Sequence, residues 1–127
     1  MKHVCLVAAI LAVSAAAQKP KKAPDVEVVD VKCHRTEDRL TLDGKVKVTG
    51  EKPLKGLVLE FAFLGSSGNI LTAQKAEVSN ETLNKNEEPA FHAETLNPPG
   101  SIQYKIRAFD IAERELRIGN AGPFTIE

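Results

Sequence analysis

Apolar and polar side chains alternate along most of the chain beyond residue 25, and this alternation predicts β-strands. The clearest case is residues 40–48. There leucines and valines occupy every second position on one face, and polar residues lie between them: Leu40, Leu42, Val46 and Val48 against Thr41, Asp43, Lys45 and Lys47. A period of two is the pattern of a strand with one face buried and the other in water.

Seven segments of this kind follow one another, separated by turn residues. They are predicted at residues 25–33, 40–48, 57–64, 70–78, 91–95, 102–109 and 116–126. Residues 70–78 alternate less clearly, and residues 80–88 read as a polar connection. In the first segment the alternation slips between Val28 and Val29, as a β-bulge would cause. Short strands in this number predict an all-β, antiparallel, two-sheet sandwich, with a small barrel as the alternative.

The more apolar phase of each predicted strand identifies the expected core. It comprises Leu42, Val46, Val48, Leu59, Phe61, Phe63, Phe91, Ile102, Tyr104 and Ile106. By the same alternation, His92 falls on the opposite phase from Phe91 and is expected to face solvent.

The start of the chain has the pattern of a cleaved signal peptide. A positive head at Lys2 and His3 precedes an uncharged apolar run over residues 4–13, and small residues follow up to Ala17. The run is shorter than the roughly 20 residues of a membrane-spanning helix. We therefore divide the chain into a signal peptide (1–17), a basic Pro/Lys tether (18–24) and a β-sandwich domain (25–127). The mature protein is then expected to be exported, periplasmic or secreted, with no stable membrane anchor.

Charge and cysteine content narrow the function further. The chain has 17 basic and 17 acidic residues, and loss of Lys2 with the leader leaves a net charge of −1. This balance argues against nucleic-acid binding, which normally shows a basic surplus. Cleavage also removes Cys5, so Cys33 has no partner for an intramolecular disulfide. We expect Cys33 to be a small buried residue, with an intermolecular bridge or a reactive thiol as alternatives.

Residues that carry catalysis or bind metals are few and scattered. His34 and His92 are the two histidines left after cleavage, and no Gly-x-Ser-x-Gly sequence is present. Cys33 and His34 are neighbours on one strand and should point to opposite faces. A zinc site needs more ligands than these. We therefore expect no catalytic residue, no metal site and no cofactor. Carbohydrate-binding clefts usually contain flat aromatic side chains against which a sugar ring can stack. The chain has no Trp and one Tyr, which weakens the case for carbohydrate binding.

Four short motifs between residues 44 and 91 carry a resemblance to a known family. They are Gly44-Lys45-Val46, Leu57-Val58-Leu59-Glu60-Phe61, Ser67-Gly68-Asn69-Ile70-Leu71 and Asn86-Glu87-Glu88-Pro89-Ala90-Phe91. In this spacing they resemble the FxLYD family of bacterial exported domains. The naming motif keeps Phe61 but lacks its Tyr-Asp end.

A second stretch, residues 96–108 with Pro99-Gly100 and Tyr104, is similar to the E–F corner of fibronectin type III domains. Both resemblances imply an immunoglobulin-like sandwich without enzyme activity. The second also implies a tyrosine corner, in which the Tyr104 hydroxyl bonds to backbone near residues 96–99.

Two classes of function stay open: a protein-interaction or accessory module, and a small-ligand or carbohydrate-binding domain. For an interaction module, the partner is an unknown protein or a second copy. The outward faces of residues 57–64 and 102–109 are only partly polar, which favours a docking surface there. The candidate partner-binding residues are Val58, Ala62, Leu64, Lys105, Arg107 and Phe109. The alternative is that Leu64 and Phe109 lie at strand ends and are capped by their own loops, and that Val58 reflects only the preference of valine for strands.

Overall fold

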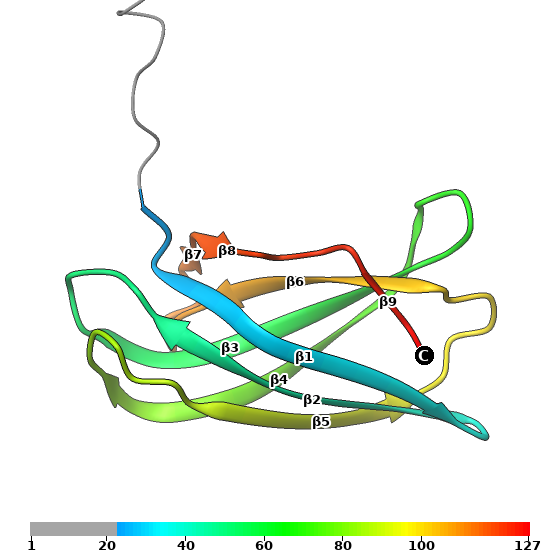
Figure 1. Cartoon of the computed structure of the whole chain (residues 1–127), viewed down its shortest axis with the longest axis horizontal. Coiled ribbons are helices and arrows are strands. Elements are labelled where there is room, and N and C mark those ends of the chain that lie inside the picture. The colour runs from blue at the N-terminus through cyan, green and yellow to red at the C-terminus, as the bar shows by residue number, and fades with distance from the viewer. Residues whose placement is uncertain (1–22) are drawn as a thin grey trace, which may run out of the picture.

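The protein is an all-β sandwich of two packed sheets (Figure 1). The computed structural model describes residues 23–127, so the predicted signal peptide and most of the predicted tether lie outside the described residues. None of these described residues belongs to a helix of the length and apolarity needed to cross a membrane. The strands are β1 (Val26–Thr36), β2 (Arg39–Val48), β3 (Leu54–Leu64), β4 (Ile70–Leu83), β5 (Ala90–Leu96), β6 (Gln103–Phe109), β7 (Glu115–Leu116), β8 (Ile118–Gly119) and β9 (Phe124–Thr125).

The first sheet has the strand order β5-β2-β1-β8, and the second has the order β4-β3-β6-β7, with β9 also pairing with β6. The six long strands pair antiparallel, as predicted, whereas the short β8 pairs parallel to β1. The predicted two-sheet sandwich is therefore confirmed. Residues 80–83 continue β4 and are not the polar connection expected there.

The slip in the first strand is a β-bulge, as predicted. The register between β1 and β2 shifts between Val28 and Asp30, and the Val29 side chain is 47% exposed while Val28 is buried. The extra residue restores the phase of the rest of β1, so that Cys33 points inward opposite Leu42.

The core lies between the two sheets and contains all but one of the predicted residues, together with others such as Leu40 and Leu57. Nine of the ten predicted core residues are buried, and the exception is Ile102, which is 45% exposed. Ile102 precedes β6, and its backbone bonds to Leu64 and Ile126 at the end of the sandwich. The strand begins only at Gln103, so the alternation of β6 does not extend to Ile102.

One side of the sandwich is closed by residues 115–127, predicted as a single strand and found as the three short strands β7, β8 and β9. β7 and β9 pair with β6 of the second sheet, and β8 pairs with β1 of the first. Beyond β9, Glu127 N–H donates to the Cys33 carbonyl, and Arg35 N–H donates to the Glu127 carbonyl. The closing segment thus hydrogen-bonds to both sheets.

The opposite side, bordered by β4 and β5, is open at one end. On β3, Phe61 and Phe63 are fully buried, yet their cross-strand partners on β4, Gln74 and Thr72, are exposed. Cross-strand partners point to the same face of a sheet. The first sheet therefore covers β3 but stops short of this part of β4.

Candidate functional site

All six candidate partner-binding residues lie on one face, the outer face of the β4-β3-β6-β7 sheet. The pairing of β3 with β6 places Val58 opposite Phe109, Ala62 opposite Lys105, and Glu60 opposite Arg107. Because these positions alternate with the buried phenylalanines of β3, their side chains point away from the core. Alternation alone had predicted this grouping.

Burial divides the apolar members of this face into two pairs. Ala62 and Leu64 are 7% and 3% exposed, so neighbouring side chains already cover them. Val58 and Phe109 are half-buried and lie opposite each other. The accessible apolar surface of the face is therefore centred on Val58 and Phe109.

Phe109 lies between two cationic side chains. Lys75 Nζ is 5.1 Å and Arg107 Cζ is 5.2 Å from the centre of its ring. Both distances fall within the range of a cation–π interaction. The aliphatic parts of Lys and Arg side chains cover apolar surface while their charged ends remain in water. The Phe109 ring is therefore partly covered, and it has a positive charge from each of these two side chains beside it.

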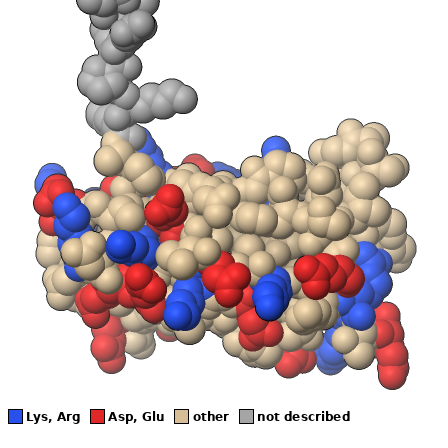
Figure 2. All heavy atoms as spheres, in the orientation of Figure 1, with Lys and Arg blue, Asp and Glu red and all other residues tan. Residues whose placement is uncertain are grey.

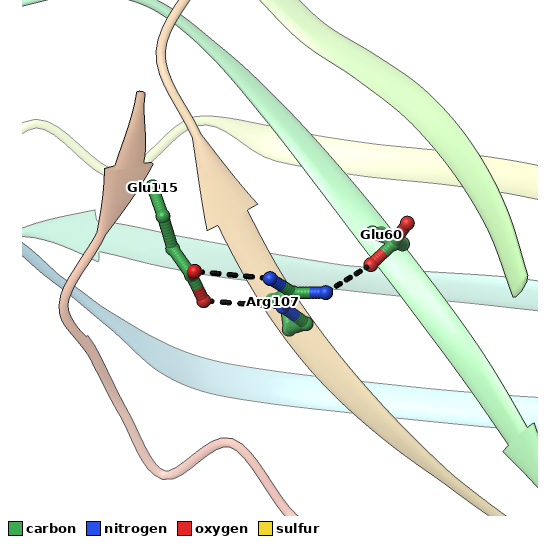
Figure 3. A network of polar contacts seen from close by, with 3 residues as sticks. All are labelled: Glu60, Arg107 and Glu115. Carbon is green, nitrogen blue, oxygen red and sulfur yellow. Dashed lines mark hydrogen bonds and ion pairs between the residues drawn. The ribbon is translucent and has the colours of Figure 1, made fainter. Parts of the chain in front are cut away.

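A carboxylate–guanidinium–carboxylate network extends from Phe109's neighbour Arg107 (Figure 3). Arg107 donates to both carboxylate oxygens of Glu115, at 3.1 and 2.9 Å, and to Glu60 at 3.2 Å. The bond from Arg107 lowers the pKa of the Glu115 carboxyl, and the same contact raises the pKa of Arg107. The bidentate geometry fixes the guanidinium across β6, β7 and β3.

The outer face of the other sheet is more polar, and on β2 its outward side chains are Thr41, Asp43, Lys45 and Lys47. Cross-strand pairs there bring opposite charges together, Asp30 with Lys45 and Lys32 with Asp43. Figure 2 shows basic and acidic side chains lying next to one another on the face turned to the viewer. On β5, His92 faces solvent as predicted, and its ring nitrogens lie 2.5 Å from Asp43 and 3.2 Å from Glu94. The bond to Asp43 is the main cause of the raised pKa of His92.

The residues considered for chemistry are not brought together. Cys33 is 1% exposed, as predicted, whereas His34 lies on the outer face. Burial raises the pKa of the Cys33 thiol to about 11, which leaves almost no reactive thiolate at neutral pH. Among residues 23–127, no three His, Cys, Asp or Glu side chains are grouped so as to hold a metal ion.

Tyr104 does not form the expected tyrosine corner. Its side chain is buried beside Phe124, with ring centres 5.4 Å apart, and within the described part of the chain its hydroxyl makes no hydrogen bond to residues 96–99. Burial, with smaller contributions from Cys33 and Glu127, raises its pKa. The corner is held instead by Ser101, whose hydroxyl donates to the Pro98 carbonyl at 2.9 Å.

A groove at the open side of the sandwich was not anticipated from the sequence. It has a volume of about 700 Å³ and is lined by Leu71, Thr72, Gln74 and residues 94–99. Its walls come from two strands that alternation had treated as ordinary half-buried elements. The groove lies where the first sheet does not cover Thr72 and Gln74 of β4, and no local sequence pattern reports how far one sheet extends over the other.

No family model and no curated protein matches the chain. Among solved structures, a β-glucuronidase from glycoside hydrolase family 2 aligns over 80% of this chain, with 10% identity and a TM-score of 0.54. The C-terminal domain of wzt aligns over 84% of it, with 9% identity and a TM-score of 0.53. A β-glucuronidase from Bacteroides uniformis aligns over 72%, with 17% identity and a TM-score of 0.46.

The chain spans 82% of the wzt domain but only 13% and 11% of the two β-glucuronidases. At these identities the first two likenesses concern the fold alone. They agree with a β-sandwich and leave the function to be argued from the chain itself.

Proposed function

We propose that this protein is an exported, non-catalytic β-sandwich module that binds a protein through the outer face of its β4-β3-β6-β7 sheet. The partner is another protein or a second copy of the chain. The observation that carries the proposal is the pair Val58 and Phe109, half-buried at the centre of that face and bordered by Lys75 and Arg107. An aromatic side chain with a neighbouring Arg, surrounded by charges, is typical of protein-binding surfaces.

The immunoglobulin-like type is part of the same proposal. With β7, β8 and β9 taken as one interrupted final strand, the fold has seven strands. The long strands have the orders β5-β2-β1 and β4-β3-β6, and the final strand pairs with β6 through β7 and β9 and with β1 through β8. These orders are supported by the sheet topology, and they suit a fibronectin type III-like sandwich. Membership of the FxLYD family rests on the motifs between residues 44 and 91.

Export is tested by the intact mass of secreted material. The mature protein should begin at or within two residues of Gln18, because the small residues after the apolar run end there. A mature species that retains residues 1–17 or carries a lipid would contradict the localisation.

The docking face is tested by the double substitution Val58→Thr, Phe109→Ser. Both side chains are only half-buried, so the melting temperature should stay within a few degrees of the parent, about 1 kcal/mol of stability. Self-association, measured by sedimentation equilibrium, or cross-linking to a partner from an extracytoplasmic extract should be lost. The matched control is Val29→Thr, which removes an exposed apolar side chain from the outer face of the other sheet and should keep binding. Unfolding of the first variant would show that the two residues belong to the core.

A further inference from the structure

The groove at the open side of the sandwich lies along the edge of the first sheet formed by β5, where a further strand could be added. β5 is the last strand of its sheet and β4 is the last strand of the other. Gln74 and Thr72 point toward the first sheet but are exposed, because no strand formed by residues 23–127 lies beyond β5 to cover them. Strands in a sheet are spaced about 4.8 Å apart. One further strand beside β5 would therefore extend the first sheet over this part of β4.

The backbone of β5 offers regularly spaced donors and acceptors at this edge. Asn97 N–H donates to the Asp38 carbonyl, and Val46 N–H donates to the Pro89 carbonyl. Both bonds continue the β2–β5 register, and bonded and non-bonded pairs alternate in an antiparallel ladder. The odd-numbered residues of β5 therefore bond to β2, while the N–H and C=O groups of His92, Glu94 and Leu96 point to the free edge. Unpaired groups of this kind are a template for another strand.

The side chains around the groove define the chemistry of what would fit. Thr72 and Gln74 form its inner wall, and Leu96, which is 65% exposed, forms part of its outer rim. Glu94 is its one charged lining residue, and the adjoining hollow shares that residue. The charged residues of groove and hollow together are Glu37, Asp38, Glu94 and Arg39, a net charge of −2. An acidic rim is complementary to a basic occupant.

We propose that β5 binds an extended basic segment of a partner protein by β-strand addition in this groove. The segment alternates: neutral β-branched residues face Thr72 and Gln74, and Lys or Arg residues face outward beside Glu94. Main-chain hydrogen bonds to His92, Glu94 and Leu96 supply affinity, and the alternating side chains supply specificity. The site is separate from the outer face of β4-β3-β6-β7 and does not depend on it.

The test uses a synthetic peptide, Lys-Val-Lys-Thr-Lys-Val-Lys, which has the seven-residue length of β5. Binding to the mature protein is followed by amide resonances and hydrogen exchange. The amides of His92, Glu94 and Leu96 should gain protection, whereas those of Ala93 and Thr95, already bonded to β2, should not change. The acidic peptide Glu-Val-Glu-Thr-Glu-Val-Glu should bind about tenfold more weakly or worse. N-methylation of the basic peptide at alternate residues should abolish binding, because it removes the donors of the ladder.

Charge-reversal substitutions in the protein distinguish binding in this groove from a general electrostatic attraction of the basic peptide to the protein. Glu94→Lys should weaken the basic peptide at least about tenfold. Glu77→Lys, the same change on the outer face of β4, should leave it within about twofold, since that exposed side chain lies outside the groove.

Three results would overturn the proposal. The first is no saturable binding of the basic peptide at about 1 mM. The second is binding without protection of the three free-edge amides, which would mean that the groove holds side chains and not a strand. The third is that the protein forms a dimer, that Glu94→Lys dissociates this dimer, and that the basic peptide does not bind. The groove would then be occupied by a second copy of the chain.

Discussion

The two sides of this sandwich differ in whether a segment of the chain connects the two sheets. On the closed side, residues 115–127 pair with β6 and with β1, and Phe124 packs on Tyr104. On the open side, β4 and β5 end their sheets, and the polar Thr72 and Gln74 occupy inward-pointing positions that the other sheet does not reach. The direction of a side chain and its burial are therefore set by different things. The alternation of the strand sets the direction, and the presence of a facing strand sets the burial.

The largest expected effect contrasts Phe61 with its cross-strand partner Gln74. Phe61→Ala should cost about 3–5 kcal/mol of unfolding free energy, because it empties a fully buried position. Gln74→Ala should change it by less than about 0.5 kcal/mol, since that side chain is exposed. Urea denaturation with an unchanged m-value measures both. A loss at Gln74 approaching that at Phe61 would mean that the open side is covered in solution.

Asp110 tests the turn that leads the chain into the closed side. Its carboxylate accepts hydrogen bonds from the backbone N–H groups of Ala112 and Arg114 and from Arg114 Nε, at 2.9–3.0 Å. Asp110→Ala should cost about 1.5–3 kcal/mol at pH 7. The isosteric Asp110→Asn should cost less, because the amide oxygen still accepts. An unchanged denaturation midpoint in both variants would show that the turn forms without the carboxylate.

The same carboxylate gives a pH dependence of defined sign. The hydrogen bond from the Arg114 backbone is the main cause of the lowered pKa of Asp110 in the folded protein. The stabilisation of the folded protein by the Asp110 carboxylate should be complete at pH values above 3.8, the ordinary pKa of an Asp carboxyl. It should fall as the pH drops through the lowered pKa of Asp110 in the folded protein. The stability curves of the parent and of Asp110→Asn should therefore converge in acid.

His92, on the outer face of the open-side strand, should show the opposite dependence. Its pKa is raised above 6.5, chiefly by the bond to Asp43, so its contribution is complete below 6.5 and is lost as the pH rises through the raised value. Denaturation at acid and alkaline pH should show His92→Gln approaching the parent as the pH increases. In an Asp43→Asn background the pH dependence should be smaller. A gap that widens with pH would contradict this assignment.

The smallest effect is expected at Tyr104, beneath the closing segment. Tyr104→Phe should change the unfolding free energy by less than about 0.5 kcal/mol, because the ring packing is kept and the hydroxyl makes no hydrogen bond within residues 23–127. Thermal denaturation of the two proteins measures this. A loss of about 1 kcal/mol would restore the tyrosine corner that the fibronectin-like pattern had implied.

Local alternation was sufficient to predict much of this architecture. It assigned the phase of β2, β3 and β6, nine of ten core residues and the bulge at Val29, because each depends on one strand and its period. It missed the exposure of Ile102, and it left open whether Leu64 is covered by its own loop; the structure shows Leu64 to be 3% exposed. For the candidate site, it grouped the six residues on one face, but it could not show that Lys75, from a third strand, lies over Phe109.

The pairing of residues 118–127 with β1 also constrains the order in which the domain can fold. The first strand of the sandwich acquires part of its hydrogen bonding from the last residues of the domain, since Val26 pairs with Ile118 and Cys33 with Glu127. Contacts so distant in sequence slow folding, because a long loop must close before they form. During synthesis β1 can pair with β2 as soon as both have been made, but no N-terminal fragment that lacks residues 118–127 has its full set of partners.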